Sequence, residues 1–101
     1  MKIMALEKEV PGVMEDQYLP HLKAEAGRVW ELYQAGVLRE IYFRQEDQSA
    51  VLILECAGRE GAREILGTLP LVRAKLIDFD IFTLTPYPGF ARLFEGKPGT
   101  P

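Results

Sequence analysis

The chain has 101 residues, of which 48% are hydrophobic and 27% are charged, and its formal net charge at pH 7 is -3. This length and composition predict one globular domain with a modest core, and they exclude a disordered or multidomain chain. The acidic balance provides no attraction for phosphate backbones or anionic lipid, so we expect neither nucleic acid nor a membrane as a partner.

The cysteine, histidine and glycine residues restrict which metals and cofactors the chain is expected to bind. Cys56 is the single cysteine and His21 the single histidine, so an intrachain disulfide and an ordinary His-rich or Cys-rich metal site are not expected. Gly58 and Gly61 match neither a Walker motif nor a dinucleotide fingerprint, and we predict no cofactor. The N-terminus "MKIMALEKEVPG" lacks the long apolar core of a signal peptide, which predicts a cytoplasmic location.

The first half of the chain predicts a strand followed by a helix. "KIMALEKEV" alternates loosely and stops at Pro11 and Gly12, as a strand closed by a loop does. Pro20 suits the first turn of a helix and Gly36 the position just past its end. One apolar stripe of this helix is predicted to hold Leu22, Ala26, Val29 and Tyr33. The charged residues predicted to lie largely off the stripe are Lys23, Glu25, Arg28 and Glu31.

The second half predicts a hairpin, a helix and a last strand. "LREIYFRQ" and "AVLILEC" are rich in β-forming residues and are separated by the polar "EDQS". "REGAREILGTL" is predicted to be a helix that Pro70 breaks. The helix face is predicted to hold Ala62, Ile65, Leu66 and Leu69. The last strand lies within "LIDFDIFTLTPYPGF", at residues 76–90.

The order β-α-β-β-α-β predicts an α+β ferredoxin-like fold with a four-stranded antiparallel sheet. Right-handed crossovers place both helices on one face of that sheet. We expect residues 1–95 to form a single domain and residues 96–101 to be a flexible tail.

The strand "AVLILEC" is apolar on both sides, since Val51 and Ile53 point one way and Leu52 and Leu54 the other. Such a strand is typical of a sheet buried on both faces. The chain has no further element to cover the second face, whereas a second copy would cover it and form a dimeric α/β barrel. We therefore expect a homodimer or a higher homo-oligomer. The apolar segment "PYPGFARLF" is expected to pack against the partner or to close a cavity mouth.

Asp78 and Asp80 are the first candidates for a site. Alternation in the last strand places them, with Phe82, on the face away from the helices. The helix-facing positions are Ile77, Phe79 and Ile81. A carboxylate crowded by another carboxylate and by Phe82 holds its proton more readily, as a general base near neutral pH requires. The alternative is that both are ion-paired or solvated strand positions, and the spacing i, i+2 favours this alternative because it is common in sheets.

His21 and three side chains around the second strand complete the candidate site. His21 lies in the first helical turn, where the helix N-terminus favours a neutral imidazole able to transfer a proton. A surface histidine at a helix start is the commoner interpretation. Arg39, Tyr42 and Arg44 are predicted to bind substrate together with Phe82. Because the second and fourth strands are sheet edges, we expect Arg39 or Arg44 of one copy to approach the aspartates of the other.

Three other side chains of chemical interest are interpreted as structural. Cys56 ends an apolar strand and is expected to act as a small buried hydrophobe rather than a nucleophile. Trp30 and Tyr33 are expected to pack on the sheet.

"AGVLREIYFR" and "AVLILECAGREGAREILGTLPLVRAKLIDFDIFTLTPYPGFARLF" resemble the muconolactone Δ-isomerase-like family of dimeric α/β-barrel proteins. The most specific element is "TLPL" at residues 68–71, which leads into a last strand that ends in a Pro-bearing segment. The resemblance implies a ferredoxin-like protomer, an oligomer built on sheet packing and a cavity at the sheet face. For the isomerase it implies a cofactor-free proton transfer that moves a double bond in a small unsaturated lactone acid.

The sequence departs from that family after the second strand. Where the isomerase carries the hairpin "GHYAN", this chain has "EDQSA", with Asp47 and Gln48 near the histidine position. The resemblance therefore carries over no catalytic residue there. Arg39 matches a basic position in the second strand of the isomerase.

Two classes of function follow. In the first, a cofactor-free isomerase acts on a small anionic or carbonyl compound, with Asp78, Asp80 or His21 moving the proton. In the second, a non-catalytic dimer binds a small apolar or aromatic molecule or is chiefly structural. The first predicts a pH-dependent rate that Asp→Asn variants lose, and the second predicts ligand-induced stabilisation without turnover.

Overall fold

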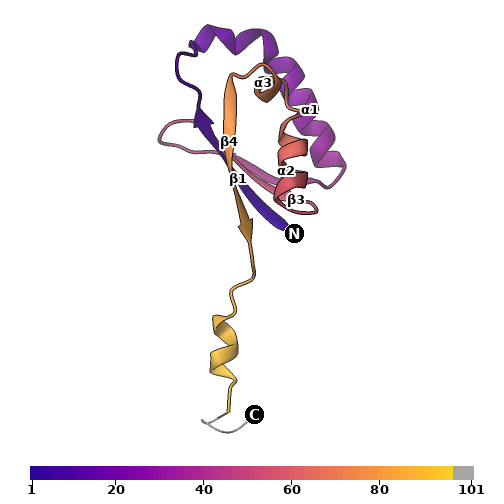
Figure 1. The fold of residues 1–101 in the computed structure, drawn as a ribbon, viewed down its shortest axis with the longest axis vertical. Coiled ribbons are helices and arrows are strands. Elements are labelled where there is room, and N and C mark those ends of the chain that lie inside the picture. The colour runs from indigo at the N-terminus through magenta and orange to yellow at the C-terminus, as the bar shows by residue number, and fades with distance from the viewer. Residues whose placement is uncertain (97–101) are drawn as a thin grey trace.

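The computed structural model describes residues 1–96, which form a four-stranded sheet with helices on one of its faces (Figure 1). The strands are β1 (Lys2–Glu9), β2 (Leu38–Phe43), β3 (Ala50–Glu55) and β4 (Ile77–Leu84). The α-helices are α1 (Leu22–Gln34), α2 (Arg59–Leu66) and α3 (Pro70–Arg73). The strand order is β2-β3-β1-β4 with antiparallel neighbours, which confirms the predicted α+β ferredoxin-like fold. The sheet of the single chain is open rather than closed into a barrel.

β1 is one of the two inner strands and pairs with both β3 and β4. Its Met4 pairs with Ile53 of β3 and with Phe82 of β4. Ile3 and Ala5 alternate with Met4 and are fully buried beneath the helices. Strand alternation therefore sends one side of β1 into the core and the other to the uncovered face.

The entry into α1 is less direct than the sequence predicts. Pro20 lies in a single 3-10 turn, Leu19–His21, and the α-helix begins one residue later at Leu22. Proline is tolerated in such a first turn because its missing N–H would have no partner there. Gly36, with φ +77°, follows the helix end as predicted, in a conformation that glycine adopts without strain.

The prediction for Pro70 is wrong. α2 already ends at Leu66, and Pro70 is the first residue of the separate short helix α3. Proline suits this position because the first N–H groups of a helix have no partner within the helix. Leu69 and Leu71, on either side of Pro70, are both buried, so the connection is part of the core.

The core is unevenly distributed beneath the two longer helices. α2 buries Ala62 and Leu66 against the sheet, whereas α1 buries only Leu32. Leu22 and Tyr33 of the predicted α1 stripe are 47% and 53% exposed. Ile77, Phe79 and Ile81 face the helices and are buried, as expected from the alternation of β4. One side of the fold is thus closed and the other side, beneath α1, is open.

The sheet face opposite the helices has no cover within residues 1–96. We call this surface the open face. Its apolar side chains are half-buried or exposed: Met4, Leu6, Tyr42, Val51, Ile53, Phe82 and Leu84. This uncovered face is the second apolar face that the alternation in β3 predicts. That a second copy of the chain covers it stays a prediction.

Residues 85–96 leave the end of β4 as a projecting segment, which we call the C-terminal arm (Figure 1). It contains one 3-10 segment, Gly89–Leu93. The rings of Tyr87 and Phe90 meet edge to face with centroids 5.1 Å apart. Apart from Gly96, the predicted flexible tail at 96–101 lies outside the described residues.

No helix in the described part of the chain combines the length and the apolar character that crossing a membrane requires.

Candidate functional site

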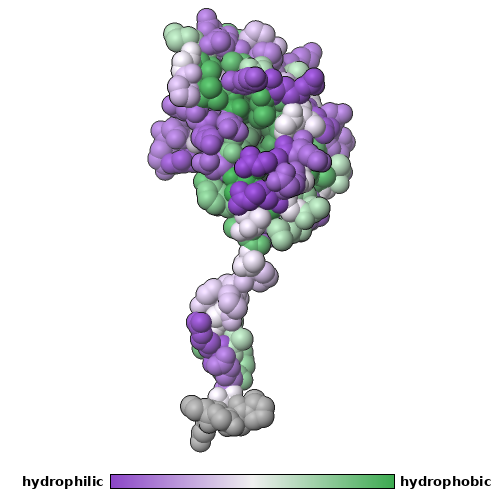
Figure 2. Space-filling view, viewed as in Figure 1, coloured by the Kyte–Doolittle hydropathy of each residue, from purple (hydrophilic) through white to green (hydrophobic). Residues whose placement is uncertain are grey.

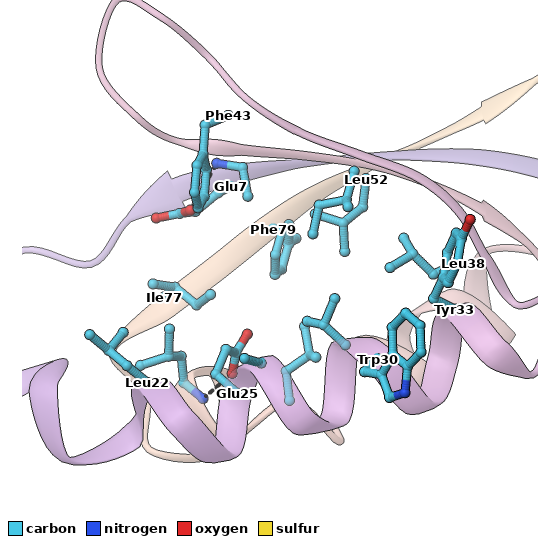
Figure 3. Close-up of a pocket in the computed structure, with 16 residues that line it drawn as sticks. Glu7, Leu22, Glu25, Trp30, Tyr33, Leu38, Phe43, Leu52, Ile77 and Phe79 are labelled. Carbon is cyan, nitrogen blue, oxygen red and sulfur yellow. Dashed lines mark hydrogen bonds between the residues drawn. The ribbon is translucent and has the colours of Figure 1, made fainter.

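The space beneath α1 is a groove of about 540 Å3 between that helix and the sheet (Figure 3). We call it the α1 groove. Figure 2 shows an apolar hollow in the upper part of the body, where α1 faces the sheet. The lining residues are Glu7, Leu22, Glu25, Ala26, Val29, Trp30, Tyr33, Leu38, Ile41, Phe43, Ala50, Leu52, Leu69, Leu71, Ile77 and Phe79. An apolar concavity with a few polar groups is the usual form of a small-molecule site.

Two polar contacts hold α1 to the segment between α2 and β4 at one edge of the groove. The Leu71 N–H at the start of α3 donates to Glu25 Oε1 at 3.0 Å. Arg28 Nε donates to Thr68 Oγ1 at 2.9 Å. These contacts fix one edge of the helix. The rings of Trp30 and Tyr33 on α1 are stacked with their centroids 5.7 Å apart, and both lie at the mouth of the groove.

Glu25 is the principal titratable group in the α1 groove. Burial among apolar side chains raises the pKa of its carboxyl group above the ordinary glutamate value. The hydrogen bond from the Leu71 N–H opposes this shift, and the negative charge of Glu7 adds to it. A carboxylate with a raised pKa in an apolar cavity holds a proton more readily than a solvated carboxylate does, which suits a group that takes up and returns a proton.

Glu7 supplies a second carboxylate from the sheet side of the groove (Figure 3). Its Oε1 accepts a hydrogen bond of 2.9 Å from the Ala50 N–H, which fixes the side chain on the strand. Within residues 1–96, the groove lining includes no lysine or arginine. The groove therefore presents two carboxylates and apolar surface, and the described part of the chain supplies no cation to its lining.

Asp78 and Asp80 lie on the open face, away from the α1 groove. Their side chains are more than half exposed, and Lys8 Nζ lies 3.8 Å from Asp78 Oδ2 and 3.1 Å from Asp80 Oδ1. Lys8 is directly opposite Asp78 in the β1–β4 register. With Phe82 they line a polar depression of about 340 Å3. The structure thus brings these three predicted residues together, and the cation between the aspartates is Lys8.

The other predicted substrate-binding side chains are engaged elsewhere. Arg44 Nη1 lies 3.7 Å from Asp47 Oδ2, and Arg39 Nε donates to the Gly36 carbonyl. The Tyr42 hydroxyl donates to Glu40 at 2.7 Å, and this bond to a carboxylate raises the pKa of Tyr42. Within one chain, these residues do not converge with the aspartates. Their approach across a subunit boundary stays a prediction.

His21 is half-buried at the residue that precedes α1. It does not line the α1 groove, yet it lies one helical turn before Glu25, and its charge acts to lower the pKa of that carboxyl group. His21 therefore lies at the helix start as predicted and close to the groove, but the side chain that enters the groove is that of Glu25.

Sequence reasoning missed Glu7 and Glu25, and the signal for both was present. Glu25 lies three residues after Leu22 and four before Val29, so it falls on the apolar stripe rather than off it. Glu7 continues the alternation of Ile3 and Ala5 toward the helices. A carboxylate at an apolar position in each of two facing elements indicates a polar group inside a cavity.

Within residues 1–96, no group of three or more His, Cys, Asp or Glu side chains is placed to hold a metal ion. Cys56 is half-buried, packs against the core, and its Sγ lies 3.6 Å from the Gly58 carbonyl oxygen. Its surroundings are those of a packing residue.

Comparison with solved structures agrees with the ferredoxin-like α+β class that the fold defines. The chain is similar to a muconolactone isomerase, with a TM-score of 0.69 and 19% identity over 87% of this chain and 92% of that chain. It is also similar to 5-chloro-2-hydroxyhydroquinone dehydrochlorinase (TftG) from Burkholderia phenoliruptrix AC1100, solved with 2,5-dihydroxybenzoquinone. That match has a TM-score of 0.66 and 13% identity over 88% of this chain and 98% of that chain.

No protein-family model matches the chain, and no curated protein matches it in sequence. The similarity to the two enzymes is one of fold.

Proposed function

We propose that the protein is a cofactor-independent isomerase that moves a proton within a small unsaturated acid or lactone, with the α1 groove as its active site. The observation that carries this proposal is Glu25, whose carboxyl group has a raised pKa inside an apolar cavity. Two enzymes share the fold, and one of their structures holds a small quinone ring. The groove volume of about 540 Å3 is sufficient for a compound of that size.

The proposed chemistry needs one base and no external reactant. Ionised Glu25 removes a proton from a carbon next to a carbonyl group, and the electrons of the C–H bond form a dienolate. The same carboxyl group returns the proton to the far carbon, so the double bond moves and no atom is gained or lost. The raised pKa of Glu25 makes the carboxyl group a stronger base than an ordinary glutamate, which favours removal of the proton from carbon.

Glu7 has a positioning role in this scheme. Held by the Ala50 N–H, it places negative charge toward Glu25 and so contributes to the raised pKa of that group. When the substrate is an acid, the negative charge of Glu7 repels the substrate carboxylate. Binding of an acid therefore needs a cation from outside the groove lining.

The proposed assembly is a homodimer in which two open faces pack together. The half-buried apolar residues Met4, Leu6, Val51 and Ile53 form the centre of that face. Lys8 and the two aspartates lie toward its β4 edge, where they would rim the interface. Sedimentation as a monomer at micromolar concentration would contradict this assembly.

The direct test measures proton exchange and double-bond movement by NMR in D2O, with muconolactone as the first probe and related small unsaturated lactones after it. We expect wild type to shift the double bond and to incorporate deuterium to the extent that the proton held by Glu25 exchanges with solvent before it is returned. Glu25→Gln keeps the size of the side chain, and we expect it to lower the rate by about 10² to 10⁴, the usual contribution of a general base.

The matched control is the pair Asp78→Asn and Asp80→Asn, which removes the carboxylates of the open face. Retention of the wild-type rate in these variants, with loss in Glu25→Gln, supports the groove. Loss in the aspartate variants with a normal Glu25→Gln rate would move the active site to the depression beside Lys8.

A non-catalytic ligand-binding protein is the second candidate, favoured by the exposed aromatic rings of Trp30 and Phe43 at the groove. It predicts that a small aromatic probe raises the melting temperature of wild type and of Glu25→Gln equally, without turnover.

A further inference from the structure

Four residues form a row across the helix-facing side of the sheet, one from each strand. Phe79 of β4 pairs with Glu7 of β1, and Ala50 of β3 pairs with Phe43 of β2. The Ala50 N–H donates to Glu7 Oε1 at 2.9 Å, which joins the two pairs into one row. All four residues line the α1 groove, so the row crosses its floor.

Ala50 leaves room between Glu7 and Phe43. Two strand spacings of about 4.8 Å separate β1 from β2, and the methyl group of Ala50 fills little of that width. The carboxylate of Glu7 and the ring of Phe43 therefore border a common space. A cation held by the carboxylate in this space can lie within about 6 Å of the ring centroid, the range of cation–π attraction.

Glu25 supplies a second carboxylate from α1 to the same groove. The negative charge of Glu7 contributes to the raised pKa of Glu25, so the two groups are close enough to interact. Each accepts one backbone hydrogen bond through its Oε1, from Ala50 for Glu7 and from Leu71 for Glu25. A carboxylate has further acceptor positions, which stay available to a ligand. A cation between the two carboxylates would also remove their repulsion.

The carboxylates of the groove differ in their compensation from those of the open face. Lys8 Nζ lies 3.8 Å from Asp78 and 3.1 Å from Asp80, so the open face balances its charge within the chain. Among the described residues, no lysine or arginine lines the groove. The charge of the groove therefore fits a ligand that brings its own cation.

The end of the groove away from Phe43 is apolar and aromatic. Figure 3 shows Trp30, Tyr33 and Leu38 together at that end, with Glu7 and Phe43 at the other. The direction of β2 agrees, because Leu38 is its first residue and Phe43 its last. A matching ligand carries a cation at one end and an apolar body at the other.

We propose that the α1 groove binds a small organic amine in its protonated form, with the ammonium group between Glu7, Glu25 and the ring of Phe43. The apolar body of the ligand lies along the groove toward Trp30. A primary ammonium group has three donors. The two carboxylates take two of them, and the third stays with water at the open mouth. The groove volume of about 540 Å3 is sufficient for an arylalkylamine.

The inference narrows the substrate class of the groove, and in this respect it rests on the proposed function. Glu7 repels the carboxylate of a simple acid, whereas an ammonium group on the ligand supplies the missing positive charge. Among small unsaturated acids and lactones, the site then prefers those that carry an amino group.

Three probes with the same ring and the same two-carbon linker test the preference for a cation. They are phenethylamine, phenethyl alcohol and hydrocinnamate, which are cationic, neutral and anionic at neutral pH. In calorimetric titrations of wild type, we expect a Kd for the amine about tenfold below that for the alcohol, and the weakest binding for hydrocinnamate. An amine that binds no more tightly than the alcohol would overturn the proposal.

Variants of the charged end locate the preference. Glu7→Gln is expected to raise the Kd of phenethylamine about tenfold and to leave that of the alcohol unchanged. Phe43→Leu is expected to raise the Kd of the amine by about two- to fivefold. The control Glu64→Gln removes the same charge from an exposed position of α2 and is expected to bind as wild type. Equal losses in Glu7→Gln and Glu64→Gln would mean attraction to net charge alone and would overturn the site.

Titration of the Glu25 carboxyl group by NMR tests the contact in wild type and needs no variant. With saturating phenethylamine we expect a lower midpoint than without it, since a nearby cation favours the ionised form. Glu7, His21 and the Leu71 N–H act on Glu25 in both samples, so the added amine is the difference between them. An unchanged midpoint would exclude the contact with Glu25.

Backbone amide signals give the position of the amine. We expect those of Ala50 and Leu71 to shift, because both N–H groups donate to the groove carboxylates. Shifts confined to Lys8, Asp78 and Asp80 would place the amine on the open face and would overturn the proposal.

The two proposals can fail separately. Amine binding in the groove of a protein without turnover would refute the isomerase and leave the cation site in place. Turnover of small lactones by a protein without a preference for the amine would refute the cation site and leave the isomerase in place.

Discussion

α1 and α2 lie on the same face of one sheet, yet only α2 closes on it. α2 presents Ala62 and Leu66, which are 0% and 3% exposed. α1 presents Trp30 and Tyr33, which remain at a groove mouth, and Glu25, whose carboxyl group faces into the groove. Closing α1 onto the sheet would desolvate Glu25 further beside Glu7, and this cost opposes closure. One carboxylate on an apolar stripe can thus make a helix the wall of a groove rather than part of a closed core.

The largest expected difference between the two sides is in stability. Leu66→Ala, beneath α2, is expected to lower the free energy of unfolding by about 2 to 5 kcal/mol, because it leaves a cavity in a packed core. Trp30→Ala removes a larger side chain but one that is 57% exposed, and we expect a smaller loss. Urea denaturation of both variants measures the difference. A larger loss for Trp30→Ala would show that α1 is packed as tightly as α2.

The next effect is on the pH dependence of stability. Since burial raises the pKa of Glu25 in the folded protein, the folded chain holds this proton to higher pH than the unfolded chain does. The resulting stabilisation is complete below the ordinary value of 4.5 and is lost as pH rises through the raised pKa. Urea midpoints between pH 4 and pH 8 are expected to show this loss in wild type and not in Glu25→Gln. The same slope in both would exclude Glu25 as its source.

A smaller effect is expected at the polar anchor of α1. Arg28→Ala removes the bond to Thr68 and is expected to cost about 1 kcal/mol, with greater acrylamide quenching of Trp30 as the helix loosens. Arg63→Ala on α2, an exposed arginine without such a bond among the described residues, is the comparison on the closed side. Equal quenching in the two variants would mean that the Arg28 contact does not position α1.

The smallest effect is expected on the open face. Lys8→Ala removes both contacts to Asp78 and Asp80, and such exposed ion pairs contribute about 0 to 1 kcal/mol. A loss well above that range in urea denaturation would show that the pairs are covered in the assembled protein.

The sheet was predictable from sequence because strand alternation is a local signal. The alternation of β4 placed Ile77 and Asp78 on opposite faces, and β3 predicted a face without cover. The α1 groove was not predictable in the same way. Leu22 and Tyr33 fit a buried stripe equally well whether the helix closes on the sheet or stands away from it. The distance between helix and sheet is set by long-range contacts such as Glu25 to Leu71, which no spacing within α1 encodes.

The predicted position of the site follows from where Glu25 is placed on α1. If Glu25 is grouped with Arg28 and Glu31 on the outer face of the helix, Asp78 and Asp80 are the remaining candidates for a catalytic carboxylate. Helical geometry places Glu25 beside Leu22 and Val29 instead. In the structure Glu25 has the apolar surroundings, and the raised pKa, that were expected for Asp78 and Asp80 as general bases.

The most direct test of the central claim is an NMR titration of the Glu25 side-chain carboxyl carbon, assigned by its absence in Glu25→Gln. We expect a titration midpoint above the ordinary value of 4.5, with a lower midpoint in Glu7→Gln, where the neighbouring charge is removed. A midpoint at or below 4.5 would contradict the assignment of Glu25 as the proton-transfer group of the α1 groove.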